Sequence, residues 1–396
     1  MPPIASSNRG KIDPLSRAVL ARAIDEGVLD ECRSLGSFRC PLRLPRALSD
    51  LWLSQAVLSR ELLAHDSLRT LRVPAIVASA PLRHDALTRF ETACIGPGLD
   101  LLESAEFPRL EGLRLERIGL GPTPAARVAA ALERLRARGL TLGIAGRVGD
   151  VGWTVEDMRA LRPFAERIEG LTLESPFAPI DFDMPNLRRL VAHVRSRGPM
   201  LDTFDWPDLP SVDELHVFTT FHNIDFAALV RTFHASKLAR RLRVLHWEFS
   251  ATAMQGLADH PMEALEELSL LANDSQRGAL AANAILERGR FPRLRAMTLR
   301  SVQQIAGLAA SPLAAQIERL SVPLSPGKWL DDWTAVRPRL TSLKTLIVQR
   351  PARLTPEQRV AIADGVPQVI WGENSARAVR RYFHADRGIA TFGANQ

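Results

Sequence analysis

The chain has 396 residues, of which 46% are hydrophobic and 24% charged, and this composition excludes an intrinsically disordered chain. Its formal net charge is +7, but all except four of the 51 basic residues are arginines, interspersed with 44 acidic residues. No run of five or more like charges is present, so the charge does not predict a basic tail that binds nucleic acid.

The N-terminal sequence, MPPIASSNRGKIDP, is not followed by an apolar segment, so it does not predict a secretory signal. The longest apolar stretch, residues 73–82, is far shorter than the roughly 20 residues of a membrane-spanning helix. The three cysteines (Cys32, Cys40 and Cys94) form no CxxC pair, which argues against a disulfide framework or a zinc knuckle. These features predict a cytoplasmic protein that does not bind membranes.

Residues 14–36 and 44–66 carry Leu, Val and Ala at helical spacing, which predicts helices in both segments. We expect residues 1–66 to form a helical cap over the first repeat of the domain that follows. A separate functional module in this segment is the alternative.

From residue 68 onward one pattern recurs: an apolar residue, two variable residues, an apolar residue, one variable residue and a third apolar residue. Its clear copies begin at Leu110, Ile168, Val212, Leu242, Leu265, Leu294, Ile317 and Leu343. Less regular copies begin at Leu68 and Leu187, and weak copies at Arg39, Phe90, Ala137 and Val366. From residue 68 to residue 343 the copies begin about 25 residues apart, which indicates a repeat architecture.

The pattern predicts a short strand, because the second and third apolar residues are two apart and therefore face the same side. Such a strand cannot bury its apolar face alone, so stacked copies are expected to share one core. Helical spacing or helix start and stop signals mark residues 123–139, 225–240, 275–290 and 355–365 between the strands. A strand followed by a helix, repeated, predicts a parallel sheet with helices on one side.

In these copies the chain resembles the leucine-rich-repeat superfamily, as a degenerate, bacterial and ribonuclease-inhibitor-like type. The resemblance covers residues 68–374, or 39–374 with the weakest copy included. It implies an α/β solenoid of horseshoe shape, with one curved parallel sheet, helices on the convex side and helical caps. The expected organisation is a cap at residues 1–66, a solenoid at 67–374, and a C-terminal helical cap and tail at 375–396. The family's turn asparagine falls on Asn273 and Asn374 and is replaced in the other copies, so irregular repeats are expected.

A search for catalytic and cofactor motifs finds no P-loop, HExxH, GxSxG or EF-hand pattern. Glycines at positions 143, 146, 149 and 152 fall every third residue, which predicts a flexible loop between two repeats. The sequence therefore predicts a non-catalytic protein without a cofactor or a metal.

The resemblance implies that positions three, five and seven of each copy lie on the open concave face, where the superfamily binds its partners. Arginines occupy five of these positions: Arg72, Arg114, Arg189, Arg300 and Arg319. Glutamates occupy five others: Glu116, Glu174, Glu214, Glu248 and Glu267. A nucleic-acid surface needs a clustered positive stripe, so this balance disfavours nucleic acid as a partner.

The central copies place an unusual set of side chains on this face: His193, His216, Phe218, His246 and Glu248. We expect them to be accessible, close together and partner-binding, because aromatic side chains are enriched at interaction hot spots. Trp247 is expected to point into the core. A metal site is disfavoured, because histidines without a matched cysteine or carboxylate spacing are weak evidence. In the alternative interpretation these are ordinary surface residues, with Phe218 covered by the chain around Phe221 and His222.

The sequence as a whole predicts a scaffold that binds an unknown protein partner on the concave face of the solenoid. One alternative is an effector-like transferase whose catalytic residues lie outside the repeats. A second alternative is a nucleic-acid-binding scaffold.

Overall fold

The computed structural model divides the chain into two compact units, Met1–Val191 and Ala192–Gln396. It describes residues 34–39, 49–57, 65–73, 76–77, 82–93, 97–118, 124–145, 153–174, 180–194, 206–219, 226–249, 257, 260–272, 285–299, 302–323, 329–349 and 354–371. Within these residues the strands of the sheet follow one another in chain order, apart from the short strand β4. Every pair of strands whose register is resolved is parallel.

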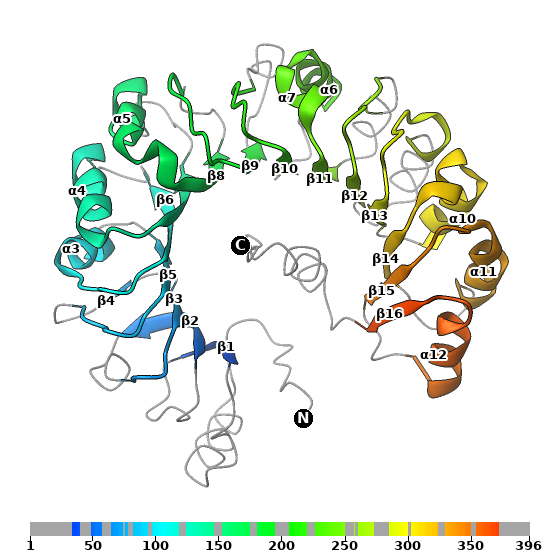
Figure 1. Cartoon of the computed structure of the whole chain (residues 1–396), viewed down its shortest axis with the longest axis horizontal. Helices are drawn as coiled ribbons and strands as arrows, with labels where there is room; N and C mark the ends of the chain where they lie inside the picture. The colour runs from blue at the N-terminus through cyan, green and yellow to red at the C-terminus, as the bar shows by residue number, and fades with distance from the viewer. Residues whose placement is uncertain are drawn as a thin grey trace, which may run out of the picture. The chain divides into compact units, whose positions relative to one another are not determined.

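The first unit consists of short parallel strands with helices on one side of them (Figure 1). Its strands are β1 (Ser34–Arg39), β2 (Asp50–Val57), β3 (Thr70–Val73), β4 (Ile76–Val77), β5 (Arg89–Ala93), β6 (Gly112–Ile118), β7 (Gly139–Ile144) and β8 (Ile168–Glu174). Its helices are α3 (Pro97–Ser104), α4 (Ala125–Leu135), α5 (Val155–Arg159) and the 3-10 helix η1 (Arg162–Arg167). Strand β9 (Arg189–Val194) spans the boundary between the units.

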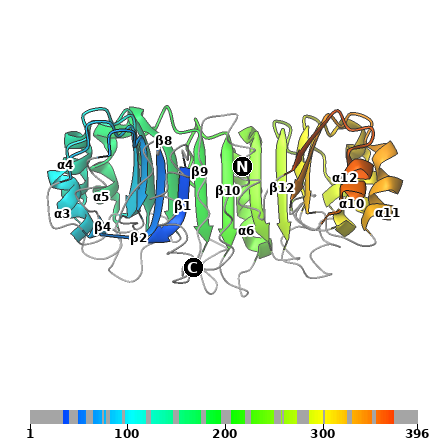
Figure 2. The same cartoon turned by 90° about the horizontal axis from the view of Figure 1, so that it is seen from below.

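The second unit repeats this arrangement, and its strands run side by side in Figure 2. Its strands are β10 (Glu214–Thr219), β11 (Val244–Phe249), β12 (Glu267–Ala272), β13 (Ala296–Thr298), β14 (Arg319–Pro323), β15 (Thr345–Gln349) and β16 (Gln368–Trp371). Its helices are α6 (Phe226–Ala235), α7 (Lys237–Arg241), α10 (Val302–Ala310), α11 (Trp329–Val336), α12 (Pro356–Ala363) and the 3-10 helices η3 (Pro312–Gln316) and η4 (Arg337–Arg339). No helix in the described part of the chain is long and apolar enough to cross a membrane.

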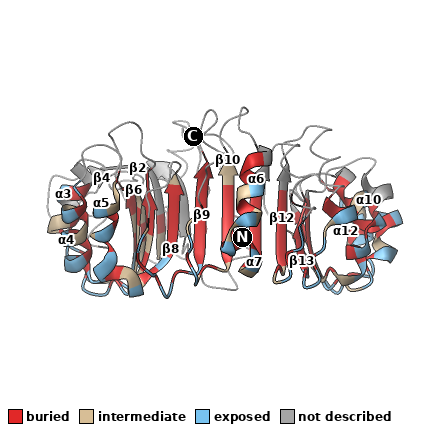
Figure 3. Ribbon diagram, turned by 90° about the horizontal axis from the view of Figure 1, so that it is seen from above, coloured by how far each residue is buried: buried red, intermediate tan, exposed pale blue. Residues whose placement is uncertain are grey.

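The repeat spacing sets the register of the sheet, as the sequence predicts. In most pairs of known register, the second apolar position of one copy pairs with the same position of the next, as Leu268 does with Leu245 and Met297. Between β7 and β8 the register shifts, and Leu142 instead of Leu140 is the partner of Leu171. The second and third apolar positions are buried, with exposed fractions of 1% at Leu268 and 0% at Leu270, and the strands are largely buried in Figure 3. Trp247 is buried against Phe233 and Trp206, so its predicted inward orientation is confirmed. The predicted parallel α/β sheet with helices on one side is therefore confirmed.

A turn that the sequence analysis missed precedes many of the strands. The backbone N–H of the first apolar residue donates to the carbonyl three residues earlier, as Leu110 does to Phe107 at 3.1 Å and Leu187 to Met184 at 3.1 Å. Equivalent bonds join Val212 to Leu209, Leu265 to Met262, Leu294 to Phe291 and Leu343 to Leu340. Four of these turns read apolar-Pro-x-apolar, and proline presets the dihedral angle that the second residue of such a turn needs. This motif identifies the start of a repeat from the sequence.

The predicted helix over residues 44–66 is wrong at Asp50–Val57, which forms strand β2. This strand pairs with β3, and Leu51 is the partner of Leu71. Leu48, Leu51 and Leu53 have the repeat spacing, but the three-residue step from Leu48 to Leu51 also suits a helix. Pairing with β3 favours the strand over the helix at these residues. Ser34–Arg39 likewise forms a strand, β1, and the rest of residues 1–48 lies outside the described residues.

Among the weak copies, those at Ala137 and Val366 are confirmed as β7 and β16. The copy at Phe90 has the wrong register, since Phe90 pairs with Leu71 and Leu113 and is therefore the second apolar residue of a copy that begins at Leu87. Gly143 lies in strand β7 and not in the predicted loop. The close approach of the Glu116 carboxylate explains the glycine, because a side chain at this position would collide with it. Residues 40–44, Asn273, Asn374, the other three spaced glycines and the cap at 375–396 lie outside the described residues.

Two predicted helices, α4 and α12, form within their expected segments. Helix α12 begins with a capping box between Thr355 and Gln358, and Gly365, at φ 67°, follows it. The single helix expected over 225–240 is instead two, because the Ser236 side chain caps a new helix, α7. Of the helix expected over 275–290, residues 285–290 are described, and 285–288 are helical.

Candidate functional site

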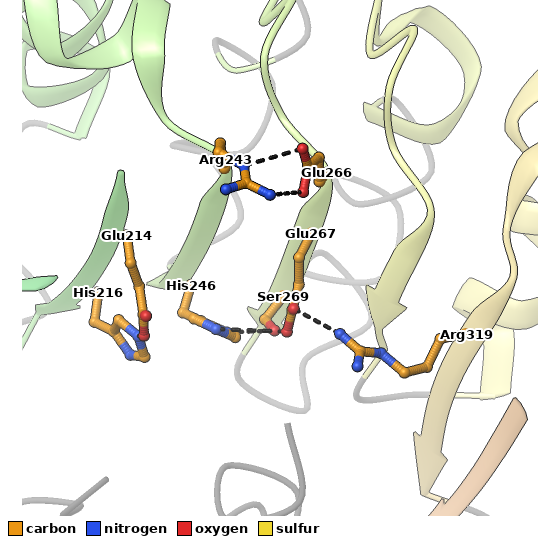
Figure 4. A network of polar contacts seen from close by, with 8 residues as sticks. All are labelled: Glu214, His216, Arg243, His246, Glu266, Glu267, Ser269 and Arg319. Carbon is orange, nitrogen blue, oxygen red and sulfur yellow. Dashed lines mark hydrogen bonds and ion pairs between the residues drawn. The ribbon is translucent and has the colours of Figure 1, made fainter. Parts of the chain in front are cut away.

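Two in-register rows of side chains cross one face of β10–β14 in the second unit (Figure 4). The third positions of the copies form the first row: Glu214, Val244, Glu267, Ala296 and Arg319. The fifth positions form the second row: His216, His246, Ser269, Thr298 and Ser321. Strand alternation puts both rows on the face opposite the apolar core residues, and we call it the inner face. Six side chains of these rows form what we call the central polar network: Glu214, His216, His246, Glu267, Ser269 and Arg319.

One end of the network is an imidazole–carboxylate pair. Nε2 of His216 lies 2.6 Å from Oε1 of Glu214, and both side chains are at most 3% exposed. His216 is also the register partner of His246, and the two ring centroids are 4.2 Å apart. One ligand atom from each of Glu214, His216 and His246 lies within 4.8 Å of the others. This is the one such group of three found among the described residues, so it is the candidate cation site of the chain.

The other end of the network is an ion pair that spans β13. Nδ1 of His246 lies 2.5 Å from the Ser269 hydroxyl oxygen, and its Nε2 lies 3.7 Å from Oε1 of Glu267. Glu267 accepts a hydrogen bond at 2.8 Å from Nη2 of Arg319, whose side chain is 30% exposed. The guanidinium holds the buried carboxylate in place, and the hydroxyl of Ser269 contacts the His246 ring. The network is thus a preorganised set of donors and acceptors.

The predicted site residues are brought together in part. His216 and His246 are adjacent, and His193 stacks on Phe218 with ring centroids 5.1 Å apart and an interplanar angle of 19°. The expectation that the histidines are accessible is wrong: His193, His216 and His246 are buried, with exposed fractions of 8%, 1% and 6%. Phe218 is partly exposed.

Glu248 lies in strand β11, where its register partner is Leu271 of β12. Its side chain lies outside the described residues, as do Phe221 and His222. Whether the predicted set binds a partner stays a prediction.

A ladder of alternating charges occupies the inner face of the first unit. Glu91 lies between two arginines, 4.0 Å from Arg72 and 3.8 Å from Arg114. Arg114 in turn contacts Glu116 at 2.5 Å. Burial raises the pKa of Glu91 from 4.5 to about 7, although both neighbouring arginines act to lower it. The four side chains are between 15% and 28% exposed, so this charged ladder lies at a partly accessible surface.

The sequence analysis disfavoured a metal site and therefore did not include Glu214 in a candidate cation site. The signal was present, because Glu214 and His216 are two apart in one strand and so lie on the same face. The sequence analysis expected His216 and His246 to lie close together, and the register of β10 on β11 places their ring centroids 4.2 Å apart.

No family model matches the chain, and no curated protein matches it.

Proposed function

We propose that the chain is a leucine-rich-repeat scaffold without catalytic activity of its own, and that it binds a protein partner on the inner face of its sheet. The repeat spacing and the parallel stack of strands support the leucine-rich-repeat assignment. The proposed compartment is the cytoplasm.

The observation that carries this proposal is the partly exposed ring of Phe218, stacked on the buried ring of His193. An aromatic ring with a fixed orientation is a typical anchor of an interface, because it buries a large area at a low entropic cost. The buried polar side chains of the neighbouring strands hold the surroundings of this ring in one arrangement. His193, His216 and His246 therefore support the surface, and Phe218 is the residue that would contact the partner.

The charge of the inner face favours a protein over a nucleic acid. Arginines and glutamates alternate in the charged ladder, and Arg319 is paired with Glu267. A nucleic-acid surface would present positive charge without paired carboxylates, because its affinity comes from neutralising phosphates. A surface of mixed sign suits the mixed charges of a protein partner.

Site-specific photo-crosslinking tests the proposal. A benzophenone-bearing amino acid replaces Phe218 in the full chain, and irradiation in the native host is followed by purification and mass spectrometry. The matched control carries the same residue in place of Val360, which is 72% exposed on α12. We expect a discrete adduct with one protein from position 218 that position 360 does not give.

An identical set of adducts from both positions, or none from position 218, would contradict a specific partner at this face. Unlabelled full chain in excess should suppress the adduct, and Phe218→Ala should compete at least about tenfold less well, as expected for a hot spot worth 1.4 kcal/mol or more.

A further inference from the structure

We propose that Glu214, His216 and His246 bind a divalent transition-metal ion of the zinc class, which ties strand β10 to strand β11. Glu214 and His216 extend from one face of β10, and His246 extends from the same face of β11 as the register partner of His216. One carboxylate oxygen and two imidazole nitrogens are a donor set that Zn²⁺ takes in proteins, with a fourth position left for water or another ligand.

The distances fit such a site after a small movement. A tetrahedral ion with bond lengths of about 2.0–2.2 Å separates its ligand atoms by about 3.3 Å. The three ligand atoms here lie within 4.8 Å of one another, and the Glu214 and His216 atoms are 2.6 Å apart. The carboxylate oxygen therefore moves away from the His216 nitrogen by less than about 1 Å, and the His246 nitrogen moves toward the other two atoms by up to about 1.5 Å. Rotation about the side-chain bonds of Glu214 and His246 would supply these movements while the two strands keep their register.

The surroundings favour a cation at this position. Glu214, His216 and His246 are exposed by 2%, 1% and 6%, and burying a carboxylate away from water is costly unless positive charge or hydrogen bonds compensate for it. A bound dication supplies that charge at short range. The hydroxyl of Ser269, 2.5 Å from Nδ1 of His246, holds the second imidazole in orientation, as hydrogen-bond partners of metal-bound histidines commonly do.

The ion would also act on the fold. Its ligands come from two neighbouring strands that belong to successive repeats, and it would add a bond between repeats to the backbone ladder. A metal that binds only the folded state stabilises that state. The competing explanation is an imidazolium–carboxylate pair, in which a proton on His216 provides the positive charge.

The first measurement uses the full-length chain, stripped with a chelator and dialysed. Zn²⁺ is titrated in competition with a chromophoric chelator, and Co²⁺ is added separately to record its visible absorption. We expect one Zn²⁺ per chain, a rise in melting temperature on binding, and the intense visible bands of four- or five-coordinate Co²⁺. No stoichiometric uptake of Zn²⁺ would overturn the proposal in favour of the imidazolium pair.

Variants then locate the ion. Glu214→Gln and His246→Gln keep the side-chain length or polarity, and each should weaken Zn²⁺ binding by more than the 10–100-fold that loss of an outer-shell partner costs. The matched control is His234→Gln, since His234 and His260 form another histidine pair in the same unit, with ring centroids 4.5 Å apart. Within the described part of the chain, neither belongs to a group of three possible ligands. Unchanged affinity in Glu214→Gln and His246→Gln would overturn the site, as would equal losses in the control.

X-ray absorption of the zinc-loaded wild-type chain keeps the test independent of variant folding. Two imidazoles and one carboxylate predict nitrogen and oxygen ligands at about 2.0–2.2 Å and no sulfur at about 2.3 Å. A sulfur shell would assign the ion to the cysteines, Cys32, Cys40 or Cys94, and would refute the proposal.

Discussion

Arg319 and Glu267 form an ion pair although their strands, β14 and β12, are separated by β13. Nη2 of Arg319 reaches Oε2 of Glu267 at 2.8 Å. Ala296 lies between them in the register, and its methyl group is small enough for the arginine side chain to cross it. A small residue in the middle strand thus permits a contact between the first and third of three consecutive repeats.

This pair is expected to contribute to stability, because Glu267 is 4% exposed and would remain buried without its partner. Arg319→Met should lower the free energy of unfolding by about 3 kcal/mol, the low end of the cost of breaking a buried pair, since the guanidinium is 30% exposed. Denaturant unfolding measures this change. Arg243→Met is the matched control: its bidentate pair with Glu266 is largely exposed and should be worth less than about 1 kcal/mol. Equal losses in the two variants would show that burial of Glu267 does not set the cost.

Leu268→Ala should lower the free energy of unfolding by about 2–5 kcal/mol, because it leaves a cavity in a tightly packed core. Leu268 is 1% exposed and is the register partner of Leu245 and Met297. Val360→Ala, on the exposed surface of α12, should change stability by less than about 0.5 kcal/mol. A loss below about 1 kcal/mol for Leu268→Ala would be inconsistent with close packing at this position.

Glu91 is expected to make the chain less stable as the pH rises from about 4.5 to about 7. Burial raises the folded-state pKa of this carboxyl from 4.5 to about 7, so the folded state holds a proton that the unfolded state has lost in this range. Stability falls with rising pH wherever the folded state binds more protons. Glu91→Gln keeps a neutral side chain at every pH, so it should be more stable than wild type at pH 8 and close to it at pH 4.

Glu103→Gln provides a control of opposite sign. A hydrogen bond from Arg127 lowers the pKa of Glu103, so its contribution is present above the ordinary carboxyl pKa and is lost as the pH falls through the folded-state value. This variant should lose stability at neutral pH and match wild type in acid. Melting temperatures recorded from about pH 2 to pH 8 compare the three chains, because the effect of Glu103 is lost only below its lowered pKa. A Glu91→Gln variant that stays parallel to wild type over this range would rule out the raised pKa.

Random-sequence DNA and RNA should bind no more tightly than roughly 10⁻⁴–10⁻⁶ M at physiological salt, the usual range for non-specific association. The reason is the pairing of arginines with glutamates on the inner face of each unit. Fluorescence anisotropy over a series of salt concentrations makes the measurement. A nanomolar dissociation constant with a steep salt dependence would contradict the proposed protein partner and indicate that the chain binds nucleic acid.

Much of the fold could be predicted from local spacing alone. The apolar residues of the copy at Leu265 are three and two residues apart, and that spacing suffices to orient Leu268 and Leu270 toward the core. Thr355, Gln358 and Gly365 likewise mark the two ends of α12, because a capping box and a left-handed glycine depend only on residues of that helix and its end. Such features involve neighbours in the chain, so the sequence determines them.

The tertiary structure decided those features that depend on pairing with a neighbouring strand or on side chains distant in the sequence. The spacing from Leu48 to Leu53 suits both a helix and a strand, and the pairing of Leu51 with Leu71 made it a strand. The repeat pattern could place Glu214 beside His216 and His216 beside His246, but the 2.6 Å contact of His216 with Glu214 needed the packed structure. The burial of His216 and the raised pKa of Glu91 depend in the same way on side chains distant in sequence, because desolvation is set by everything that surrounds a group.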